Sequence, residues 1–323
     1  MANQDHLSML MRGGEAWKLW RTEYHDVRPD LSYANLRSAD LRRANLRAAN
    51  LQSVDLREAH LQDADLRDAD LSGADLSWAY LSRADIRKAR LDKANLRQAQ
   101  LWGANLCECS MHGAELSEAN LRETNLSRAD LSSANLSNAN LYRANLREAT
   151  LHATNLDQAD LRADLREAQL QGASLREASL LHASMAQADL SGADLQRAML
   201  QYASLAHTIL KGANLSHSTL DFAHLPGADL EGARLLGASL LSVDLSEANL
   251  RRADLSGANL SMANLSKALL QDSNLSYADL SKADLRDANL VGANLSYARV
   301  EHTMFGSIDL LNIRGLDTIN QFE

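Results

Sequence analysis

The sequence predicts a solenoid, in which the chain winds into stacked coils, and two observations lead to this prediction. The first is the period: a leucine returns every fifth residue, as in LREAHLQDADLRDADLSGADL from Leu56 to Leu76, and an alanine stands two places before nearly every one. Five residues advance an α-helix by about 500°, so successive leucines would spread over all its sides. In a β-strand the same spacing places successive leucines on opposite faces. A period of five therefore indicates an architecture of its own.

The second observation is that the repeat occupies most of the chain. The leucine positions number 27 from Leu31 to Leu161 and 30 from Leu165 to Leu310, and 52 of these 57 are leucine. The other five are apolar as well: Ile86, Met111, Met185, Val300 and Phe305. We expect the leucines and the preceding alanines to point inward as stacked ladders, each buried leucine contributing about 1.5–3 kcal/mol.

The repeat resembles the motif of the pentapeptide repeat family, which is A(D/N)Lxx in outline. The stretches LSGADLSWAY, LSRADIRKAR and LSSANLSNAN match it directly, and the resemblance covers residues 29–310. It implies an all-β solenoid, namely a right-handed quadrilateral parallel β-helix in which four pentapeptides form the four sides of one coil. At four repeats per coil the leucine positions correspond to about 14 coils. Residues 29–310 are therefore predicted to form one β-helix.

The outward positions indicate how the chain turns at its corners. The residue before the leucine is Asp or Asn at 36 of the 57 positions, and short carbonyl side chains bond nearby backbone N–H groups in turns. The Asp and Asn residues at this position are therefore interpreted as turn residues, and the aspartates are not interpreted as acid/base catalysts. Eleven of the 15 glycines stand two places after the leucine, so we expect a positive φ at that position in some turns.

One step of the repeat is short. In LDQADLRADLREAQL, Leu161 and Leu165 are only four residues apart, and the period of five then resumes. One outward residue is missing from this repeat. We expect a distorted corner near Arg162, with the β-helix continuing beyond it.

The ends of the solenoid need caps, because a bare coil exposes leucines and strand edges. Residues 1–28 are predicted to form a helical N-terminal cap with a break at Gly13-Gly14. Its apolar residues with helical spacing are Leu7, Leu10, Met11, Trp17 and Trp20. This opening also resembles the N-terminal cap of cyanobacterial pentapeptide repeat proteins, and the alternative is an amphipathic helix that binds a partner. Residues 311–323 are expected to form a small C-terminal tail or cap.

We expect a cytoplasmic protein. The opening MANQDHLSMLMRGG lacks the sustained apolar run of a signal peptide, and no stretch of about 18 apolar residues predicts a transmembrane helix. Cys107 and Cys109 take an outward and an inward position in the repeat, so no disulfide between them is expected. A reduced, cytoplasmic chain is the natural interpretation, and a metal site at this CxC pair is the alternative.

The sequence carries no recognisable catalytic motif. It has no Gly-rich phosphate loop, no H-E-x-x-H and no G-x-S-x-G. His207 and His224 are expected on one side, one coil apart, but we find no carboxylate or cysteine to complete a metal set, so they are interpreted as solvated. A solenoid filled with leucine also offers no natural pocket. The chain is therefore predicted not to be an enzyme and to use no cofactor or metal.

The family resemblance implies one alternative function. Quinolone-resistance members of the family mimic B-form DNA and bind DNA gyrase, which requires a concentrated negative surface. When the outward residues are sorted by side, the four sides carry net charges of −4, −3, +1 and −2 in a chain of net charge −9. Arginines interleave with acids, which is typical of a solvated surface. No side is strongly basic, so neither a nucleic acid nor a membrane is an expected partner.

The favoured function is a non-enzymatic structural or protein-interaction role with an unidentified partner. Between Gln169 and Ser239, Asp or Asn occupies only four of the fifteen positions before the leucine. Outward apolar residues recur in this region at spacings near twenty, which stacks them about 5 Å apart. The candidate contact residues are Leu181, Met199, Tyr202, Phe222, Leu241 and Met262. They form either an interface with a protein partner or a second copy, or stabilising ladders whose exposure is ordinary.

Overall fold

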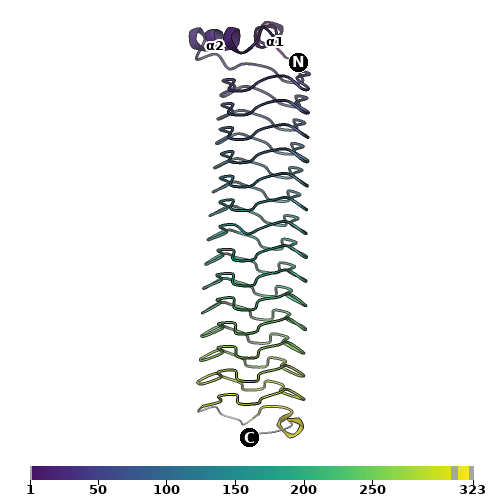
Figure 1. The fold of residues 1–323 in the computed structure, drawn as a ribbon, viewed down its shortest axis with the longest axis vertical. Helices are drawn as coiled ribbons and strands as arrows, with labels where there is room; N and C mark the ends of the chain where they lie inside the picture. The colour runs from purple at the N-terminus through teal and green to yellow at the C-terminus, as the bar shows by residue number, and fades with distance from the viewer. Residues whose placement is uncertain (1, 307–311, 320–323) are drawn as a thin grey trace. The chain divides into compact units, whose positions relative to one another are not determined.

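The computed structural model describes residues 2–306 and 312–319, and the chain divides into two compact units. Unit 1 is Met1–Asp160 and unit 2 is Leu161–Glu323. Each unit is a stack of coils, and the two N-terminal helices belong to unit 1 (Figure 1). The division between the units falls at the four-residue step of the repeat. The expected number of coils stays a prediction.

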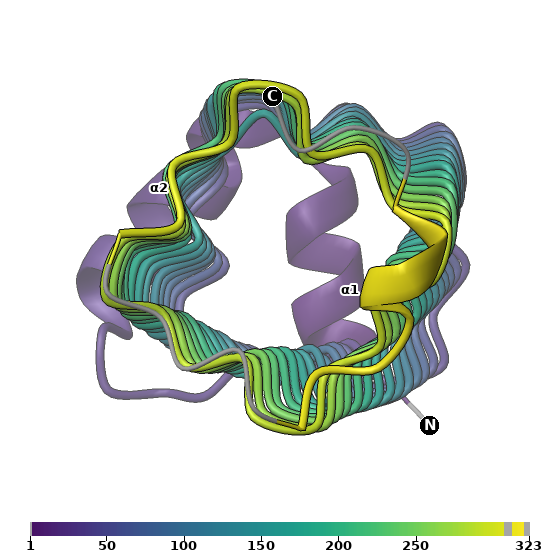
Figure 2. The ribbon, with the colours of Figure 1, turned by 90° about the horizontal axis from the view of Figure 1, so that it is seen from below.

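Successive coils within a unit pair through parallel bridges between residues twenty places apart. Two backbone hydrogen bonds make a bridge: the Leu200 N–H donates to the Thr219 carbonyl over 2.7 Å, and the Thr219 N–H donates to the Ala198 carbonyl over 3.0 Å. Seen along the stack, the coils have four sides (Figure 2). The bridges run from Asp30↔Asn50 to Asn140↔Asp160 in unit 1 and from Asp164↔Ser184 to Asn294↔Arg314 in unit 2.

The interior of each unit is filled by the residues of the leucine and alanine positions. Side chains at the leucine positions from Leu31 to Val300 are at most 4 % exposed, which confirms the inward ladders. A few hydroxyl residues replace the alanine and find backbone partners. Thr208 Oγ1 donates to the Met185 carbonyl over 3.0 Å. The inward position therefore accepts a small polar residue only where its hydroxyl group is satisfied, because an unsatisfied one would cost about 1–3 kcal/mol.

Apart from the four-residue step, the described corners share one backbone conformation. The leucine carbonyl accepts a hydrogen bond from the N–H group three residues later, as between Leu200 and Ala203 at 3.0 Å. The residue two places after the leucine has φ between +51° and +75° in every described corner from Tyr33 to His302 except the short step. The positive φ expected in some turns is thus general. Non-glycine residues adopt it at a cost of about 1–2 kcal/mol, which their N–H groups help to offset by bonding the next coil, as from Tyr202 to Asp221 at 3.1 Å.

The Asp or Asn before the leucine serves both its own corner and the neighbouring coil. Asn214 Oδ1 accepts a hydrogen bond from the Ser216 N–H group over 3.2 Å, which confirms the interpretation as turn chemistry. Asn214 Nδ2 also donates to Asp194 Oδ1, one coil earlier, over 3.3 Å. An asparagine stacked on an aspartate therefore replaces a repulsion between two carboxylates with a hydrogen bond.

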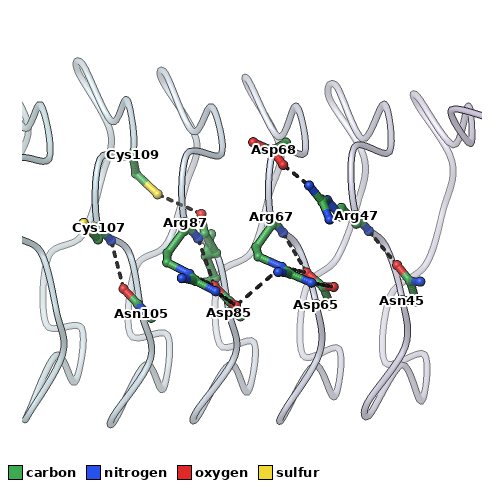
Figure 3. A network of polar contacts seen from close by, with 11 residues as sticks. Asn45, Arg47, Asp65, Arg67, Asp68, Asp85, Arg87, Asn105, Cys107 and Cys109 are labelled. Atoms are coloured by element: carbon green, nitrogen blue, oxygen red, sulfur yellow. Dashed lines mark hydrogen bonds and ion pairs between the residues drawn. The ribbon is translucent and has the colours of Figure 1, made fainter. Parts of the chain in front are cut away.

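Where aspartate is stacked on aspartate in unit 1, an arginine lies between the two carboxylates. Arg57 donates to the Asp55 carboxylate over 2.8 and 2.6 Å, and its Nε lies 3.9 Å from Asp75 in the next coil. The hydrogen bonds from Arg57 hold the pKa of Asp55 below its usual value. The same arrangement is repeated on the opposite side of the coils (Figure 3) by Arg67, Asp65 and Asp85.

The four-residue step makes a tighter corner. The Ala163 N–H group donates to the Leu161 carbonyl, two residues earlier, over 2.7 Å. None of the five residues 161–165 takes a positive φ. The Leu161 N–H group still reaches the following coil and donates to the Ser179 carbonyl over 2.7 Å. The distortion expected near Arg162 is therefore confirmed, and it leaves the pairing with the next coil intact.

Two short helices precede the coils of unit 1. Helix α1 spans Gln4–Met11 and helix α2 spans Gly14–Glu23. Asn3 caps α1, because its Oδ1 accepts hydrogen bonds from two N–H groups of the first turn. Gly13, with φ of 101°, separates the helices. The break expected at Gly13-Gly14 is confirmed.

Helix α2 is anchored to the first coils by polar contacts of buried side chains. Trp17 is 1 % exposed, and its Nε1 donates to the Asn45 carbonyl over 2.8 Å. Trp20 stacks on Trp17 with ring centroids 4.9 Å apart. Arg21 donates to the Arg47 carbonyl over 3.1 Å. These contacts hold α2 against the backbone of unit 1.

The apolar residues of α1 differ in how deeply they are buried. Leu10 is buried and Leu7 is half-buried. Met11 is 64 % exposed, although its helical spacing groups it with Leu7 and Leu10. Met11 is the last residue of α1, and its side chain lies in solvent instead of against the coils.

The described part of the C-terminal segment pairs with unit 2. Arg314 forms a parallel bridge with Asn294, and the Tyr297 N–H group donates to Thr318 Oγ1 over 2.8 Å. A 3-10 turn, η1, spans Leu316–Thr318. Leu310 and parts of the predicted tail, residues 311 and 320–323, lie outside the described residues. The C-terminal cap of 311–323 therefore stays a prediction.

The arginine between stacked aspartates predicts a pH-dependent stability. The depressed pKa of Asp55 means that its ion pair stabilises the fold above the ordinary aspartate pKa near 4 and loses this effect as pH falls through the depressed value. We expect Arg57→Gln to lower the free energy of unfolding at neutral pH and to lose this effect in acid, measured by denaturant unfolding across pH.

Arg97→Gln is the matched control, because Arg97 occupies the same repeat position on the same side and forms no ion pair within the described residues. Its effect should be small and independent of pH. An equal effect of both substitutions at every pH would contradict the role given to Arg57.

A second prediction concerns Gly315, which has φ of +79° and would place an added Cβ 2.5 Å from the backbone N and Cα of Ser296. We expect Gly315→Ala to release residues 312–319 from unit 2 and to raise their amide hydrogen exchange by at least about tenfold. Gly232→Ala is the control, since Gly232 has φ of +65° and open space around its Cα. Unchanged exchange in the Gly315 variant would show that the close packing at Ser296 is not needed.

Candidate protein-interaction site

The six predicted contact residues lie on one side of unit 2, which we call the aromatic side. Its outward residues form three columns, which contain the positions before, one after and two after the buried leucine. Members of one column are twenty residues apart and lie in successive coils. The buried leucines that define this side are Leu180, Leu200, Leu220, Leu240 and Leu260.

The column two places after the leucine contains a ladder of stacked rings. Tyr202 stacks on Phe222 with ring centroids 5.2 Å apart and planes 6° apart, and His182 stacks on Tyr202 at 5.0 Å and 19°. Tyr202 is 52 % exposed and Phe222 47 % exposed. Met262 follows in the same column, two coils beyond Phe222, and is 57 % exposed. Because the rings stack along the column, they present their edges to solvent.

The remaining predicted residues lie beside this ladder. Met199 belongs to the column before the leucine and is 43 % exposed. Leu181 and Leu241 share the column one place after the leucine, but they are half-buried and three coils apart. Gln201 and Asp221 stand between them. The six residues are thus a ladder with apolar neighbours and not one unbroken apolar row.

His182 was not among the predicted contact residues, although the sequence contains the signal. It stands twenty residues before Tyr202 and at the same position of the repeat. The same spacing marks Tyr277 and Tyr297, a second stacked pair on another side of unit 2, with ring centroids 5.0 Å apart and exposures of 66 % and 56 %. Exposed ring pairs in this fold are therefore found by comparing residues twenty apart.

The aromatic side is almost free of charge. Among its fifteen outward positions from Ser179 to Met262, Asp221 is the one charged residue. Its carboxylate is engaged by the next coil: Oδ1 accepts the Leu241 N–H over 3.0 Å and the Ser239 hydroxyl over 2.5 Å. Charged residues make up 23 % of the whole chain, so this side is chemically distinct. Low charge with exposed aromatic rings is the composition of the core of a protein interface.

His207 and His224 do not form a metal site within the described residues. The His224 Nδ1 atom lies 2.9 Å from Asp244 Oδ2, so His224 has a carboxylate neighbour that the sequence did not indicate. His207 lies apart, with its ring over Gly227 of the next coil. In residues 2–306 and 312–319 no three His, Cys, Asp or Glu side chains are arranged to hold a metal ion.

The two cysteines of unit 1 point to different environments, as the repeat predicts (Figure 3). Cys109 is buried, and its Sγ donates to the Ile86 carbonyl over 2.9 Å. Burial raises the pKa of the Cys109 thiol to about 12, which makes it a poor nucleophile and metal ligand. Cys107 is half-buried on the outer surface, where it accepts a hydrogen bond from the Ser127 hydroxyl over 3.4 Å. Among residues 2–306 and 312–319, neither thiol belongs to a group of three side chains that could hold a metal ion.

None of the described helices has the length and apolar character needed to cross a membrane.

Comparison with known proteins gives a family and several solved relatives. The family model described as pentapeptide repeats matches in overlapping copies that together cover residues 30–310. A search of curated proteins found no match. Among solved structures, the chain is 34 % identical to HetL, a pentapeptide repeat protein involved in heterocyst differentiation regulation from the cyanobacterium Nostoc sp. strain PCC 7120. That match covers 73 % of this chain and 89 % of HetL, with a TM-score of 0.45.

Two further solved structures are more distant or cover less of the chain. A pentapeptide repeat protein of the Arabidopsis thaliana thylakoid lumen is 34 % identical over 28 % of this chain and 63 % of its own, with a TM-score of 0.28. QnrB1, a plasmid-mediated fluoroquinolone resistance protein, is 19 % identical over 72 % of this chain and 88 % of its own, with a TM-score of 0.28. With the family model matched along most of its length, the chain belongs to the pentapeptide repeat family, whose fold is the right-handed quadrilateral β-helix.

Proposed function

We propose that this protein is a non-enzymatic protein-interaction solenoid and that the aromatic side of unit 2 contacts its partner. The observation that carries the proposal is the exposed ladder of Tyr202 and Phe222 on a side with one charged residue. Such rings bury a large apolar area on binding at a small cost in conformational entropy. The partner is a protein, either a different one or a second copy of this chain.

The alternative is a purely structural role, in which the rings stack only to stabilise neighbouring coils. Stacking is worth about 0.5–1.5 kcal/mol beyond area burial, and it explains why the rings align. It does not explain why Met199 and Met262 are also exposed on the same side, or why charge is missing there. Exposed apolar side chains without charged neighbours favour contact with another protein.

Binding to DNA gyrase as a DNA mimic has less support. A mimic needs unneutralised carboxylates in close array. In unit 1 the stacked aspartates are bridged by arginines, as Asp55 and Asp75 are by Arg57. In unit 2 asparagines are stacked on aspartates, as Asn214 is on Asp194. Both arrangements dilute the negative charge that the alternative requires.

We place the protein in the cytoplasm, as the sequence predicts. The support is that Cys107 and Cys109 are both free thiols, which suits a reducing compartment.

The test is a paired capture experiment with the full chain as bait. The variant carries Tyr202→Ser and Phe222→Ser, and we expect it to capture the partner at least about tenfold less, because aromatic residues at the centre of an interface typically contribute about 2 kcal/mol or more each. The backbone tolerates serine at this position, since Ser242 stands in the same column with φ of 53°. Captured proteins are quantified from a lysate of the source organism, and light scattering reports self-association.

The matched control carries Tyr277→Ser and Tyr297→Ser, which removes an equally exposed stacked pair from another side of the same unit. It should capture and self-associate as the unmodified chain does. A partner that is lost equally with both variants, or kept with both, would contradict the assignment of the aromatic side.

A further inference from the structure

Unit 1 has a side with an excess of arginine, which we call the arginine side. Its outward residues between Asp40 and Arg143 include five arginines and three acids, a net charge of +2 in a chain of net charge −9. The arginines are Arg42, Arg43, Arg83, Arg122 and Arg143, and the acids are Asp40, Asp63 and Glu123. The buried leucines that define this side are Leu41, Leu61, Leu81, Leu101, Leu121 and Leu141.

Two of these arginines are already neutralised by neighbouring carboxylates. Arg42 donates to Asp40 over 2.8 and 2.6 Å, and Arg83 donates to Asp63 over 2.8 and 2.9 Å. Arg43, Arg122 and Arg143 form no ion pair with any residue of the described part of the chain. Glu123 likewise has none there, and the net charge of +2 already includes it. The three free guanidinium groups are exposed and available to a partner.

Two of the three free arginines are held in place by an aromatic ring. The guanidinium carbons of Arg122 and Arg143 lie 5.2 and 5.1 Å from the centre of the Tyr142 ring. Contact with an aromatic ring orients a guanidinium group while leaving its N–H donors free. Such a pre-organised donor set loses less entropy when it binds a carboxylate.

A groove continues this side towards the N-terminal helices. It has a volume of about 610 Å³ and is lined by Arg42, Arg43, Gln62, Asp63 and Arg83, together with Asp40 and Gly14 at the start of α2. Arg43 supplies the free positive charge of the groove. The arginine side thus has a groove near the helices, and Arg122 and Arg143 lie on the same side further along the unit.

The aromatic rings of the arginine side favour a protein over a nucleic acid. Single-stranded nucleic acids bind by stacking bases on ring faces. The Tyr142 ring is flanked by the two arginines, and the Tyr80 ring stacks on His60 at 4.9 Å and 6°. Tyr80 remains 42 % exposed, and Trp102 on the same side is 38 % exposed. A net charge of +2 is also small for a phosphate backbone, which proteins typically meet with about 6–10 contacts.

We propose that the arginine side binds an acidic segment of a partner protein, with Arg122 and Arg143 donating to its carboxylates and the exposed side chains of Tyr80 and Trp102 contacting its apolar side chains. Charge complementarity selects the partner, and the planar fork of arginine matches the two oxygens of a carboxylate. The surface lies in unit 1 and does not rest on the function proposed for the aromatic side of unit 2.

The test measures binding of a fluorescein-labelled peptide of alternating glutamate and tyrosine to the full chain by fluorescence anisotropy. We expect saturable binding that weakens as salt is added, because the contacts are charged and exposed. The double variant Arg122→Gln, Arg143→Gln should bind about tenfold more weakly. The control variant Arg97→Gln, Arg251→Gln removes the same charge from other sides, where both arginines are exposed, and should bind as the unmodified chain does.

A labelled oligothymidylate and a peptide of alternating lysine and tyrosine complete the comparison. The proposal predicts that both bind more weakly than the glutamate peptide. It is overturned if the glutamate peptide does not bind, if both double variants weaken it equally, or if the oligothymidylate binds more tightly. Thermal unfolding of each variant confirms that the fold is retained.

Discussion

The hydrogen bonds between successive coils are the interaction on which the rest of each unit depends. The N–H groups of buried leucines bond carbonyls of the next coil, nineteen residues further on, as from Leu200 to Thr219, or eighteen further on at Leu161. The register of twenty residues follows from these bonds, and it brings the leucines into one ladder and the alanines into another. Burial of the ladders then stabilises the same register, so backbone pairing and core packing require the same periodicity.

The same register also stacks surface residues of like charge on one another in neighbouring coils. Identical positions lie in contact in neighbouring coils, so two acids in one column repel each other. Two arrangements reduce this repulsion: an asparagine stacked on an aspartate, as Asn214 is on Asp194, and an arginine that bridges two aspartates, as Arg57 does. The mixed charge noted along the chain is therefore a consequence of stacking. Two sides lack this balance of charges: the aromatic side has almost no charge, and the arginine side has arginines without an ion pair. These are the sides that we propose bind partners.

Much of this fold could be predicted from the sequence, because the backbone follows the period of five with few exceptions. The inward ladders, the corner at the short step and the helix break at Gly13-Gly14 all follow from local pattern. The exposure of Met11 could not be predicted in this way, since helical spacing does not say which face of a helix meets the coils. The role of His182 was missed because apolar residues were sought, whereas the ladder selects flat rings at intervals of twenty.

Because the leucine points inward and its three neighbours point outward, insertions and deletions affect the core and the surface differently. The four-residue step removes one outward residue, yet the N–H group of Leu161 still pairs with the following coil. Loss of a whole pentapeptide would preserve every corner but turn all later residues of that unit by one side. Between Tyr202 and Phe222 such a loss would place the two rings on adjacent sides, and the fold would survive while the surface was rearranged. Mutations that keep the repeat intact can therefore be the ones that change which partner is recognised.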